Sequence, residues 1–487
     1  MLDAISRPTK ILTVFFSTEM WERYGFYVVQ ALLALYLSLH LGIGDKQTYM
    51  LVGSFTALTY ISPIIGGWIA DNFLGQRVSV LAGAVFLFCS YVVLAFSTNL
   101  HHLLLSLAMI ATGTGLLKPN VSALLGKQYK ISDPRRDSGF TIFYLGITTG
   151  IILGTTLPSQ LQKAFGWSTC FISAAIGLIL AFLVFYFGTR VLKVQEYSTP
   201  QRGAIANWSI AGGVLFLAYI VFFFVLNNPD MANFFFGGVV LISVGIVLRI
   251  AYQEQSEQRY KTLSLLLLFV ISVFFWSFYF EMFMALTLFI TRAVQPIVFG
   301  IHFPAPYYVS VQSFGMIIFG IVLSKFWSTI RYKNIAHAIS IKFMISMLCM
   351  LAAYTIILFS TSNVTSLALI SAVPILGAYL MISLAELMLS PIGLSAVTQL
   401  SSEHVVSTLM GVFFVSLGIG GFLSGQLAKL TAIDDKTLSL VQVKTQYLHG
   451  FEILIAILVG ACVITAILCW IIKKFSDKVD WQDLHLN

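Results

Sequence analysis

Long apolar segments follow one another along almost the whole chain, with only short polar stretches between them. A segment of about 20 apolar residues is long enough to cross the hydrocarbon core of a bilayer as a helix. Helices are favoured in lipid because they satisfy every backbone polar group within the segment. The chain therefore predicts an all-α membrane protein with fourteen transmembrane helices, near residues 11–40, 48–70, 77–98, 101–125, 138–160, 168–190, 206–227, 232–251, 263–292, 306–330, 336–360, 366–398, 404–430 and 449–473.

The composition indicates a membrane protein and argues against a nucleic-acid-binding one. Only 10% of the 487 residues are charged, 58% are hydrophobic, and the mean hydropathy is +0.90. So few charges could not cover the surface of a soluble domain. The formal net charge of +8 comes from lysines and arginines that gather in the loops of one side, among them Arg135, Arg136, Lys473 and Lys474. This positive-inside pattern predicts that both termini are cytoplasmic, and that the lipid bilayer rather than a nucleic acid is the partner.

No residue pattern indicates an enzyme, a metal site or a bound cofactor. The sequence shows no nucleotide-binding loop, no metal-ligand spacing and no nucleophile–base motif. The five cysteines fall in apolar segments without a CxxC pair, so we interpret them as small core residues. None of the eight histidines is placed near the middle of an expected span. The first apolar segment is a full span, so we expect no cleavable signal peptide.

Three charged residues lie inside the first apolar segment. Glu19, Glu22 and Arg23 are spaced i, i+3 and i+4, which places them on one helical face, and Tyr27 and Gln30 continue that face. A charge at the centre of a membrane helix costs on the order of 2.5–3.5 kcal/mol, so these side chains must face protein or a water-filled cavity. Two acids beside a fixed cation suit a site that responds to protons as the coupling ion. The alternative is a buried ion pair that only holds helices together.

The polar stretches divide the fourteen segments into three groups. The longest stretches, 193–207 and 253–261, enclose a pair of apolar segments with almost no charge. We interpret this pair as a hairpin inserted between two six-helix bundles. Two related six-helix halves are the major facilitator plan, in which the substrate site lies between the halves. The predicted domains are an N-terminal bundle over 1–195, the hairpin with its linkers over 196–260, and a C-terminal bundle over 261–487.

The segment Gly66–Arg77, between the second and third spans, fits the facilitator loop signature G-x-x-x-D-x-x-x-G-x-R. Glycines in such a segment allow two helices to approach closely. Asp71 and Arg77 are predicted to tie the cytoplasmic ends of neighbouring helices. Their predicted role is gating rather than substrate binding.

Four longer motifs, in order along the chain, resemble those of the proton-dependent oligopeptide transporter family. The first, EMWERYGFY at Glu19–Tyr27, is similar to that family's ExxER(F/Y)xYY motif. The others resemble its fourth-helix signature, its loop into helix five and its tenth facilitator helix; they are Gly113–Ser122, Asp133–Tyr144 and Ala385–Ser395. The resemblance covers essentially the whole chain. Because the inserted hairpin is typical of bacterial members, it also implies a bacterial inner-membrane location.

The resemblance implies uptake of di- and tripeptides driven by inward proton movement. A zwitterionic peptide needs one partner for its carboxylate and another for its amine. Arg23 and Lys118 are expected to bind the carboxylate, and Glu386 is expected to bind the amine. Pro119 is expected to bend or break the helix next to Lys118. Apolar walls that carry a hydroxyl group are expected from Tyr27 and Tyr60.

Competition for one arginine would couple the proton to the substrate. When the substrate occupies Arg23, Glu22 loses its partner and takes up a proton. We expect Glu22 to be the main proton carrier, with Glu19 assisting. We also expect Lys118 and Glu386 to pair when no substrate is bound.

The chain departs from the family pattern at several positions of the expected site. Gln30 stands where the family usually has an arginine, and Phe280 stands where its partner glutamate belongs, so both members of one cross-bundle ion pair are replaced. Glu281 follows one residue later and is a further candidate for substrate binding. Thr148 and Gln312 stand where asparagines are usual near the peptide amine. These changes leave a modified amino acid or a peptide-like metabolite as an alternative substrate.

Two other functions fit a membrane protein of this kind. A drug–proton antiporter of the same superfamily usually carries a G-x-x-x-G-P-x-x-G-G-like run in helix five, where this chain has Thr148–Thr156. A membrane sensor that transports nothing is the second alternative, and the lack of a large soluble signalling domain counts against it. Stimulation of uptake, rather than of extrusion, by external acid would favour the symporter. We expect a monomer that acts on a small-molecule substrate.

Overall fold

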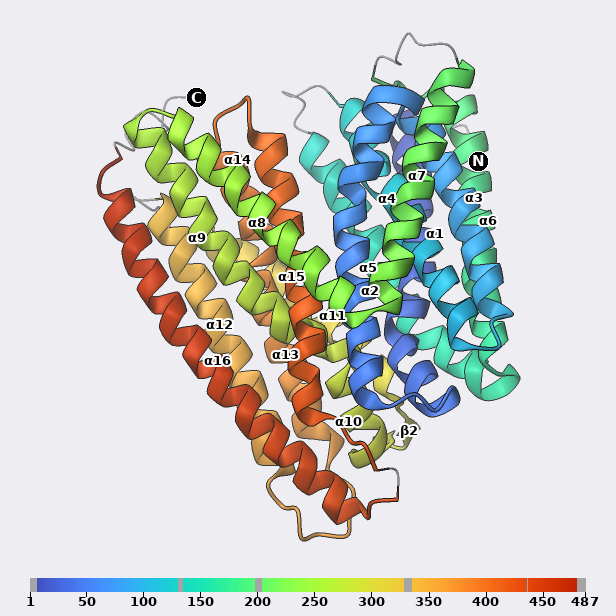
Figure 1. Ribbon diagram of the computed structural model, residues 1–487, viewed down its shortest axis with the longest axis vertical. Coiled ribbons are helices and arrows are strands. Elements are labelled where there is room, and N and C mark those ends of the chain that lie inside the picture. The colour runs from blue at the N-terminus through green and yellow to red at the C-terminus, as the bar shows by residue number, and fades with distance from the viewer. Residues whose placement is uncertain (1–6, 130–134, 198–203, 328–334, 436, 480–487) are drawn as a thin grey trace. The chain divides into compact units, whose positions relative to one another are not determined.

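The computed structural model describes residues 7–129, 135–197, 204–327, 335–435 and 437–479, and most of them are helical (Figure 1). Two short strands, β1 (Ile297–Val298) and β2 (Ile301–His302), pair antiparallel. The first two residues of the Asp133–Tyr144 motif lie outside the described residues.

Each predicted span corresponds to a described helix or to a pair of consecutive helices. Within the described residues, thirteen helical segments are long and apolar enough to cross a membrane, and the remaining predicted span is the first helix, which carries the charged triad. The predicted all-α architecture is therefore confirmed. The helices are α1 (Arg7–Leu35), α2 (Asp45–Ile69), α3 (Gln76–Ala95), α4 (Leu100–Lys127), α5 (Arg135–Phe165), α6 (Trp167–Val191), α7 (Ala204–Asn227), α8 (Pro229–Gln253), α9 (Ser256–Tyr279), α10 (Ala285–Ala293), α11 (Ala305–Trp327), α12 (Ile335–Thr361), α13 (Ala372–Leu387), α14 (Ser390–Leu400), α15 (Val406–Ala428) and α16 (Leu440–Ser476), with short helical turns η2 (Tyr36–His40), η3 (Ala70–Leu74), η4 (Phe280–Phe283) and η5 (Lys429–Thr431).

Two predicted spans are interrupted rather than continuous. The span predicted at 263–292 is divided into α9 and α10 by the tight turn η4, and Met284 leaves helical geometry with φ −128° and ψ −99°. The span predicted at 366–398 is divided at Leu389, with φ −119°, just before α14 begins with Ser390 and Pro391. A proline fits the first turn of a helix but not its interior, which accounts for the second interruption.

Several details of the sequence-based prediction are wrong for local reasons. The last span begins at Leu440 rather than near 449, because Ser439 and Gln442 form a reciprocal capping box at its start. The span predicted from 366 begins only at Ala372, after the N-cap residue Ser371. Of the two effects expected of Pro119, a bend or a break, the break is not found, since α4 runs from Leu100 to Lys127 with the proline inside.

Contacts group the described residues into two units. The first contains the residues up to Gly42 together with Leu58–Ala232, and the second contains Ile43–Ala57 together with the residues from Asn233 on. Within the first unit, α7 packs on α4 and η3. Within the second, Phe236 of α8 stacks against Phe422 of α15, with ring centroids 4.4 Å apart. This grouping assigns one helix of the predicted hairpin to each unit, while the division at 195 and 260 stays a prediction.

Two glycines let α2 and α4 approach each other within the first unit. A Cβ atom on Gly66 would collide with the carbonyl group of Gly115, and a Cβ atom on Gly115 would lie 2.6 Å from the carbonyl oxygen of Ser62. Small residues are the usual means by which membrane helices come this close. The close approach brings the residues around Gly115 on α4, including Lys118 one turn later, near the Tyr60 region of α2.

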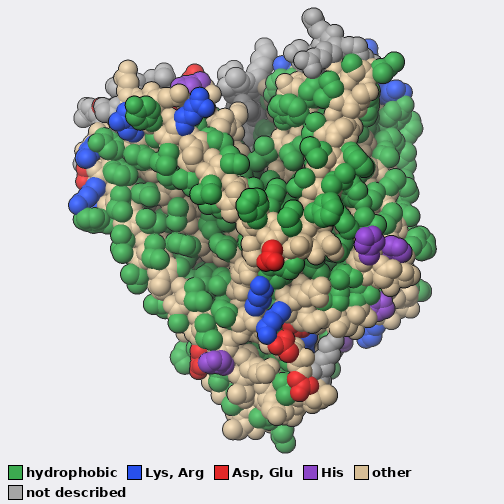
Figure 2. Space-filling model, in the orientation of Figure 1, with side chains coloured by type: hydrophobic (Ala, Val, Ile, Leu, Met, Phe, Trp, Pro, Cys, Tyr) green, Lys and Arg blue, Asp and Glu red, His purple; other side chains and the backbone are tan. Residues whose placement is uncertain are grey.

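Large apolar side chains are exposed along the spans, as a surface in contact with lipid requires. Hydrophobic side chains dominate the visible face in Figure 2. Leu241 and Phe234 of α8 are 75% and 83% exposed, and Phe216 of α7 is 63% exposed. Lipid tails are as apolar as these side chains, so exposing the side chains to a bilayer carries no hydrophobic penalty. The same exposure to water would be unfavourable.

Replacing Gly66 with alanine should destabilise the first unit, because the new Cβ atom would collide with backbone atoms, which cannot move aside as a side chain can. Overpacking of this kind costs about 1–3 kcal/mol. Gly67→Ala is the matched control, since its Cβ atom would meet only the Cβ atom of Pro119 at 3.9 Å. Thermal melting in detergent should give Gly66→Ala the lower Tm of the two variants. Equal melting temperatures would contradict the close approach of α2 and α4.

Candidate functional site

The charged triad of α1 forms a compact buried cluster. Arg23 donates from Nε and one terminal nitrogen to the two carboxylate oxygens of Glu22, at 2.5 and 2.6 Å. Arg23 Nε lies 3.5 Å from Glu19 Oε1, and the three side chains are at most 5% exposed. The second oxygen of Glu19 has no hydrogen-bond partner among the described residues. The predicted proximity of the three charges is thus found, with one guanidinium serving two carboxylates.

A neighbouring helix adds a second cation to this cluster. Lys118 of α4 interacts electrostatically with Arg23, Glu22 and Glu19. Its ammonium nitrogen lies 4.4 Å from the centre of the Tyr60 ring on α2, in the geometry of a cation–π contact. The first unit therefore places two cations and two acids within range of electrostatic interaction, and an apolar aromatic face lies beside one of the cations.

The remaining candidates of α1 are Tyr27, which is partly buried, and Gln30, which is buried. Gln30 is 2% exposed. Tyr27 packs edge-on against Phe26, with ring centroids 5.3 Å apart, and Phe26 also lies under the guanidinium of Arg23 at 4.9 Å.

Helix α5 reaches the cluster through a glycine but contributes little polarity. A Cβ atom on Gly150 would lie only 2.7 Å from the Cβ atom of Arg23, so the two helices touch at this point. Thr148, two residues earlier, is buried and donates to the carbonyl oxygen of Tyr144 on its own helix at 3.2 Å. An asparagine amide there would keep further donors for a ligand.

The second unit contains an acid held by hydrogen bonds. Gln312 of α11 donates from Nε2 to Oε2 of Glu386 on α13 at 2.6 Å, and Tyr279 also hydrogen-bonds the carboxylate. Ser383 donates to the backbone oxygen of Gln312 at 2.7 Å and fixes the two helices to each other. The structure thus brings together two of the residues predicted to bind the amine of a substrate.

Glu281 lies at the interruption between α9 and α10, and its side chain is fully buried. Neither carboxylate oxygen has a hydrogen-bond partner of normal geometry among the described residues. The hydroxyl of Ser424 and the backbone N–H of Ala285, the first residue of α10, lie near it. Within the described ranges, no three histidine, cysteine, aspartate or glutamate side chains gather closely enough to hold a metal ion.

The two residues of the predicted gate are not joined to each other. Asp71 of η3 accepts a hydrogen bond from Gln76 Nε2 at 2.8 Å. No ion pair links Asp71 to Arg77 within the part of the chain that the structure describes. Their predicted role in gating stays a prediction.

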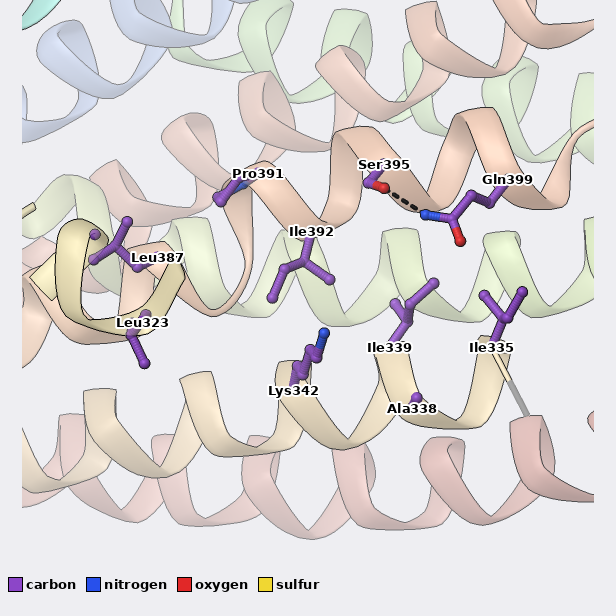
Figure 3. Close-up of a pocket in the computed structure, with 11 residues that line it drawn as sticks. Leu323, Ile335, Ala338, Ile339, Lys342, Leu387, Pro391, Ile392, Ser395 and Gln399 are labelled. Atoms are coloured by element: carbon purple, nitrogen blue, oxygen red, sulfur yellow. Dashed lines mark hydrogen bonds between the residues drawn. The ribbon is translucent and has the colours of Figure 1, made fainter. Parts of the chain in front are cut away.

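A separate cavity of about 430 Å³ lies among α11, α12, α13 and α14 of the second unit (Figure 3). None of the predicted site residues lines it. Among the described residues that line it, Lys342 alone is charged, and most of the others are apolar.

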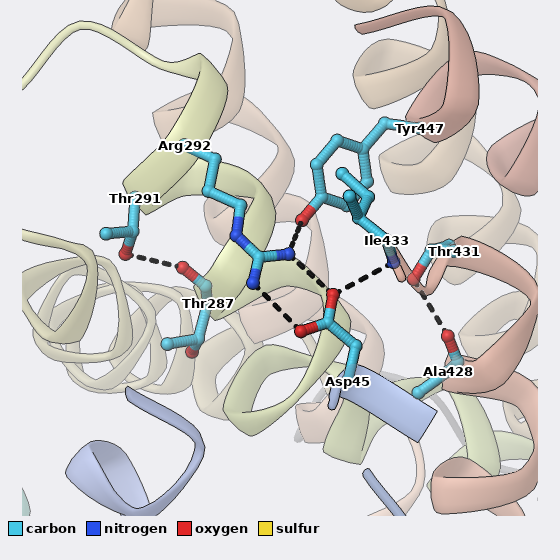
Figure 4. Close-up of polar contacts among 8 residues, drawn as sticks. All are labelled: Asp45, Thr287, Thr291, Arg292, Ala428, Thr431, Ile433 and Tyr447. Atoms are coloured by element: carbon cyan, nitrogen blue, oxygen red, sulfur yellow. Dashed lines mark hydrogen bonds and ion pairs between the residues drawn. The ribbon is translucent and has the colours of Figure 1, made fainter. Parts of the chain in front are cut away.

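Sequence reasoning missed a buried ion pair in the second unit (Figure 4). Arg292 of α10 donates to both carboxylate oxygens of Asp45, the first residue of α2, at 2.5 and 2.8 Å. Asp45 also accepts from the backbone N–H of Ile433 at 3.0 Å, and Arg292 donates to the hydroxyl of Tyr447 at 3.2 Å. An acid at the start of a helix usually indicates only a favourable helix dipole. The two partners are separated by 247 positions in the sequence, so no local sequence pattern indicates that they pair.

Removing both partners of this pair should cost less stability than the sum of the two single losses. The side chain of Asp45 is 1% exposed and that of Arg292 is 17% exposed, so either one alone would be a buried charge without its partner. We expect Asp45→Asn and Arg292→Gln each to cost up to about 3 kcal/mol. The loss of stability in the double variant should be smaller than the sum of the losses in the two single variants. Thermal melting of all four proteins measures this coupling, and strictly additive losses would contradict it.

The chain is similar to one protein family and to curated members with known names. The family model described as the POT family matches residues 77–446. The dipeptide and tripeptide permease A of Edwardsiella piscicida is 29% identical over 441 residues, which cover 89% of this chain and 88% of that protein. The permease of the same name from Escherichia coli K12 is 29% identical over 451 residues, which cover 90% and 88%.

Solved structures have the same fold. A glutamate-to-glutamine mutant of the peptide transporter POT in complex with alafosfalin has a TM-score of 0.81 and 27% identity, covering 96% of this chain and 95% of that one. The crystal structure of tetrameric PepTSo2 has a TM-score of 0.83 at 24% identity, covering 96% and 100%, and shows the fold alone. Both the fold and the family that the motifs indicated are confirmed. Since the family model spans well over half of its residues, this chain belongs to the POT family.

Proposed function

We propose that this chain is a proton-coupled symporter that imports di- or tripeptides, or similar small molecules, by alternating access. The observation that carries the proposal is the buried cluster of Glu19, Glu22 and Arg23 with Lys118 close by. Charges in membrane-spanning helices are expensive and are usually functional. The names of the curated relatives, which are dipeptide and tripeptide permeases, support peptides as the substrate class.

The carboxylate of the substrate is bound by the cations of the first unit. Arg23 offers a planar fork that suits a carboxylate, as its two hydrogen bonds to Glu22 illustrate. Lys118 adds a point charge, and the aromatic face of Tyr60 beside it suits an apolar side chain of the substrate. The side chains of Tyr27 and Gln30 complete this set on α1.

The amine of the substrate is bound by Glu386. Its carboxylate already accepts a hydrogen bond from Gln312, which holds it in place for an ammonium group. Gln312 is one methylene longer than the asparagine usual in the family, and the hydroxyl of Thr148 is bonded within its own helix. These altered donors reshape the pocket for the amine and leave a modified amino acid or a peptide-like metabolite as an alternative substrate. Glu281 is a further candidate for this end of the site.

The proton is coupled through competition for Arg23. In the described state both oxygens of Glu22 are bonded to this guanidinium. A substrate carboxylate that binds Arg23 leaves Glu22 as a buried acid without its partner, and taking up a proton removes the charge. Glu19 shares the same guanidinium and assists. Asp71 and Arg77 act in gating on the cytoplasmic side, where both termini lie.

Replacing Glu22 with glutamine should abolish uphill accumulation while leaving exchange intact. Glutamine keeps the shape of the side chain but cannot carry the proton. In proteoliposomes with acid outside, the variant should lose dipeptide accumulation but still exchange labelled for unlabelled dipeptide across the membrane. Glu452→Gln is the control, because Glu452 is an exposed acid on α16. Accumulation at the wild-type level in Glu22→Gln would refute the coupling mechanism. Extrusion stimulated by external acid in the wild type would instead favour an antiporter.

Replacing Glu386 with glutamine should weaken the recognition of a free amine. A hydrogen bond to a charged group contributes about 1.5–3 kcal/mol, so the preference for a free dipeptide over its N-acetylated form should fall about ten-fold or more. The two dissociation constants can be measured by ligand-induced thermal shifts of the purified protein. A preference unchanged by Glu386→Gln would place the amine elsewhere.

A further inference from the structure

The cavity among α11 to α14, here called the α12 groove, is built differently from the candidate transport site. Apolar side chains form most of its walls, including Leu323 of α11, Ile339 of α12 and Ile392 of α14. Lys342 of α12 projects into the groove toward Ile392 (Figure 3). One basic side chain in an apolar groove suits a molecule with an anionic end and an apolar remainder.

Lys342 lies at a point of its helix from which its long side chain can reach the level of the lipid headgroups. It lies seven residues after Ile335, the first residue of α12. At a rise of 1.5 Å per residue this is about 10 Å inside the helix end. The polar headgroup region extends about 5–8 Å outside the hydrocarbon core on each side. The long side chain of a lysine at this depth reaches the boundary between acyl chains and headgroups.

Two polar side chains of α14 line the same groove. Gln399 donates from Nε2 to Oγ of Ser395 at 2.5 Å. An amide nitrogen carries a second N–H, and a hydroxyl group can donate as well as accept. Ser395 and Gln399 therefore add donors to the charge of Lys342, and no acidic residue is among the described residues that line the groove.

We propose that the α12 groove binds an anionic phospholipid of the surrounding bilayer. Its phosphate is held by Lys342 with Ser395 and Gln399, and its acyl chains lie along Leu323 and Leu387. Basic pockets between transmembrane helices are a recognised way of binding anionic headgroups. A free anion would use the charge but not the apolar walls, and a neutral lipid would use the walls but leave the charge uncompensated. This inference does not depend on the substrate proposed above.

A glycine in the wall offers a way to fill the groove. A Cβ atom added to Gly320 would meet only Leu387 Cδ2, at 3.8 Å, so a larger side chain can enter the space without a collision at its base. The groove can therefore be tested by removing its charge and, independently, by occupying its volume.

Native mass spectrometry of the detergent-purified protein, titrated with phosphatidylglycerol or with phosphatidylcholine, tests the proposal. The wild type should bind phosphatidylglycerol more tightly than phosphatidylcholine. Lys342→Gln should reduce this preference about five-fold, the effect of one basic residue at a lipid surface, and Lys342→Arg should retain it. Gly320→Leu should weaken the binding of phosphatidylglycerol by filling the groove.

Arg249→Gln is the matched control, because Arg249 is an exposed cation near the end of α8 and lies outside the groove. It should leave the preference for phosphatidylglycerol unchanged. Melting curves of all variants without added lipid establish that each is folded. The proposal is overturned if Lys342→Gln keeps the wild-type preference, if the wild type binds the two lipids equally, or if Gly320→Leu binds phosphatidylglycerol as the wild type does.

Discussion

The cost of burying charge governs how this protein is built. In a low-dielectric interior a charged side chain needs a partner of opposite charge. This requirement restricts where the residues that supply the partner can lie. Arg23 is matched by Glu22 and Glu19 within one helix. Arg292 is matched by Asp45, which comes from a distant part of the sequence. In the proposed mechanism the first arrangement exchanges a partner for a substrate carboxylate, whereas the second is closed by hydrogen bonds from Ile433 and to Tyr447.

Interrupted helices provide the second means of placing polar groups at membrane depth. Where α9 gives way to α10, the chain forms a tight turn and buries Glu281 beside the first N–H of the following helix. The interruption between α13 and α14 follows Glu386 by three residues. Broken helices of this kind are common at the binding sites of transporters, because their free ends can interact with a ligand or an ion. Both interruptions in the second unit thus coincide with an acid.

Local sequence rules predicted the helices well and their ends less well. Length and hydropathy placed every span, since only a helix satisfies the backbone in lipid. The start of α16 was placed too late because its first turns are polar, and the capping pair Ser439 and Gln442 decides the boundary instead. Pro119 was expected to bend or break α4, yet the helix is not broken there, and the side-chain amide of Asn120 donates from Nδ2 to the carbonyl oxygen of Leu116 at 2.7 Å.

The sequence by itself determined the spans, the family resemblance and the meeting of Glu19, Glu22 and Arg23, because neighbours along one helix are related by its fixed geometry. Only the tertiary structure decided that Asp45 pairs with Arg292 and that Gln312 holds Glu386. Those contacts join helices that are far apart in the chain, so they depend on how the helices pack. Packing depends in turn on small residues such as Gly66 and Gly115, whose effect becomes visible only when the facing helix is known.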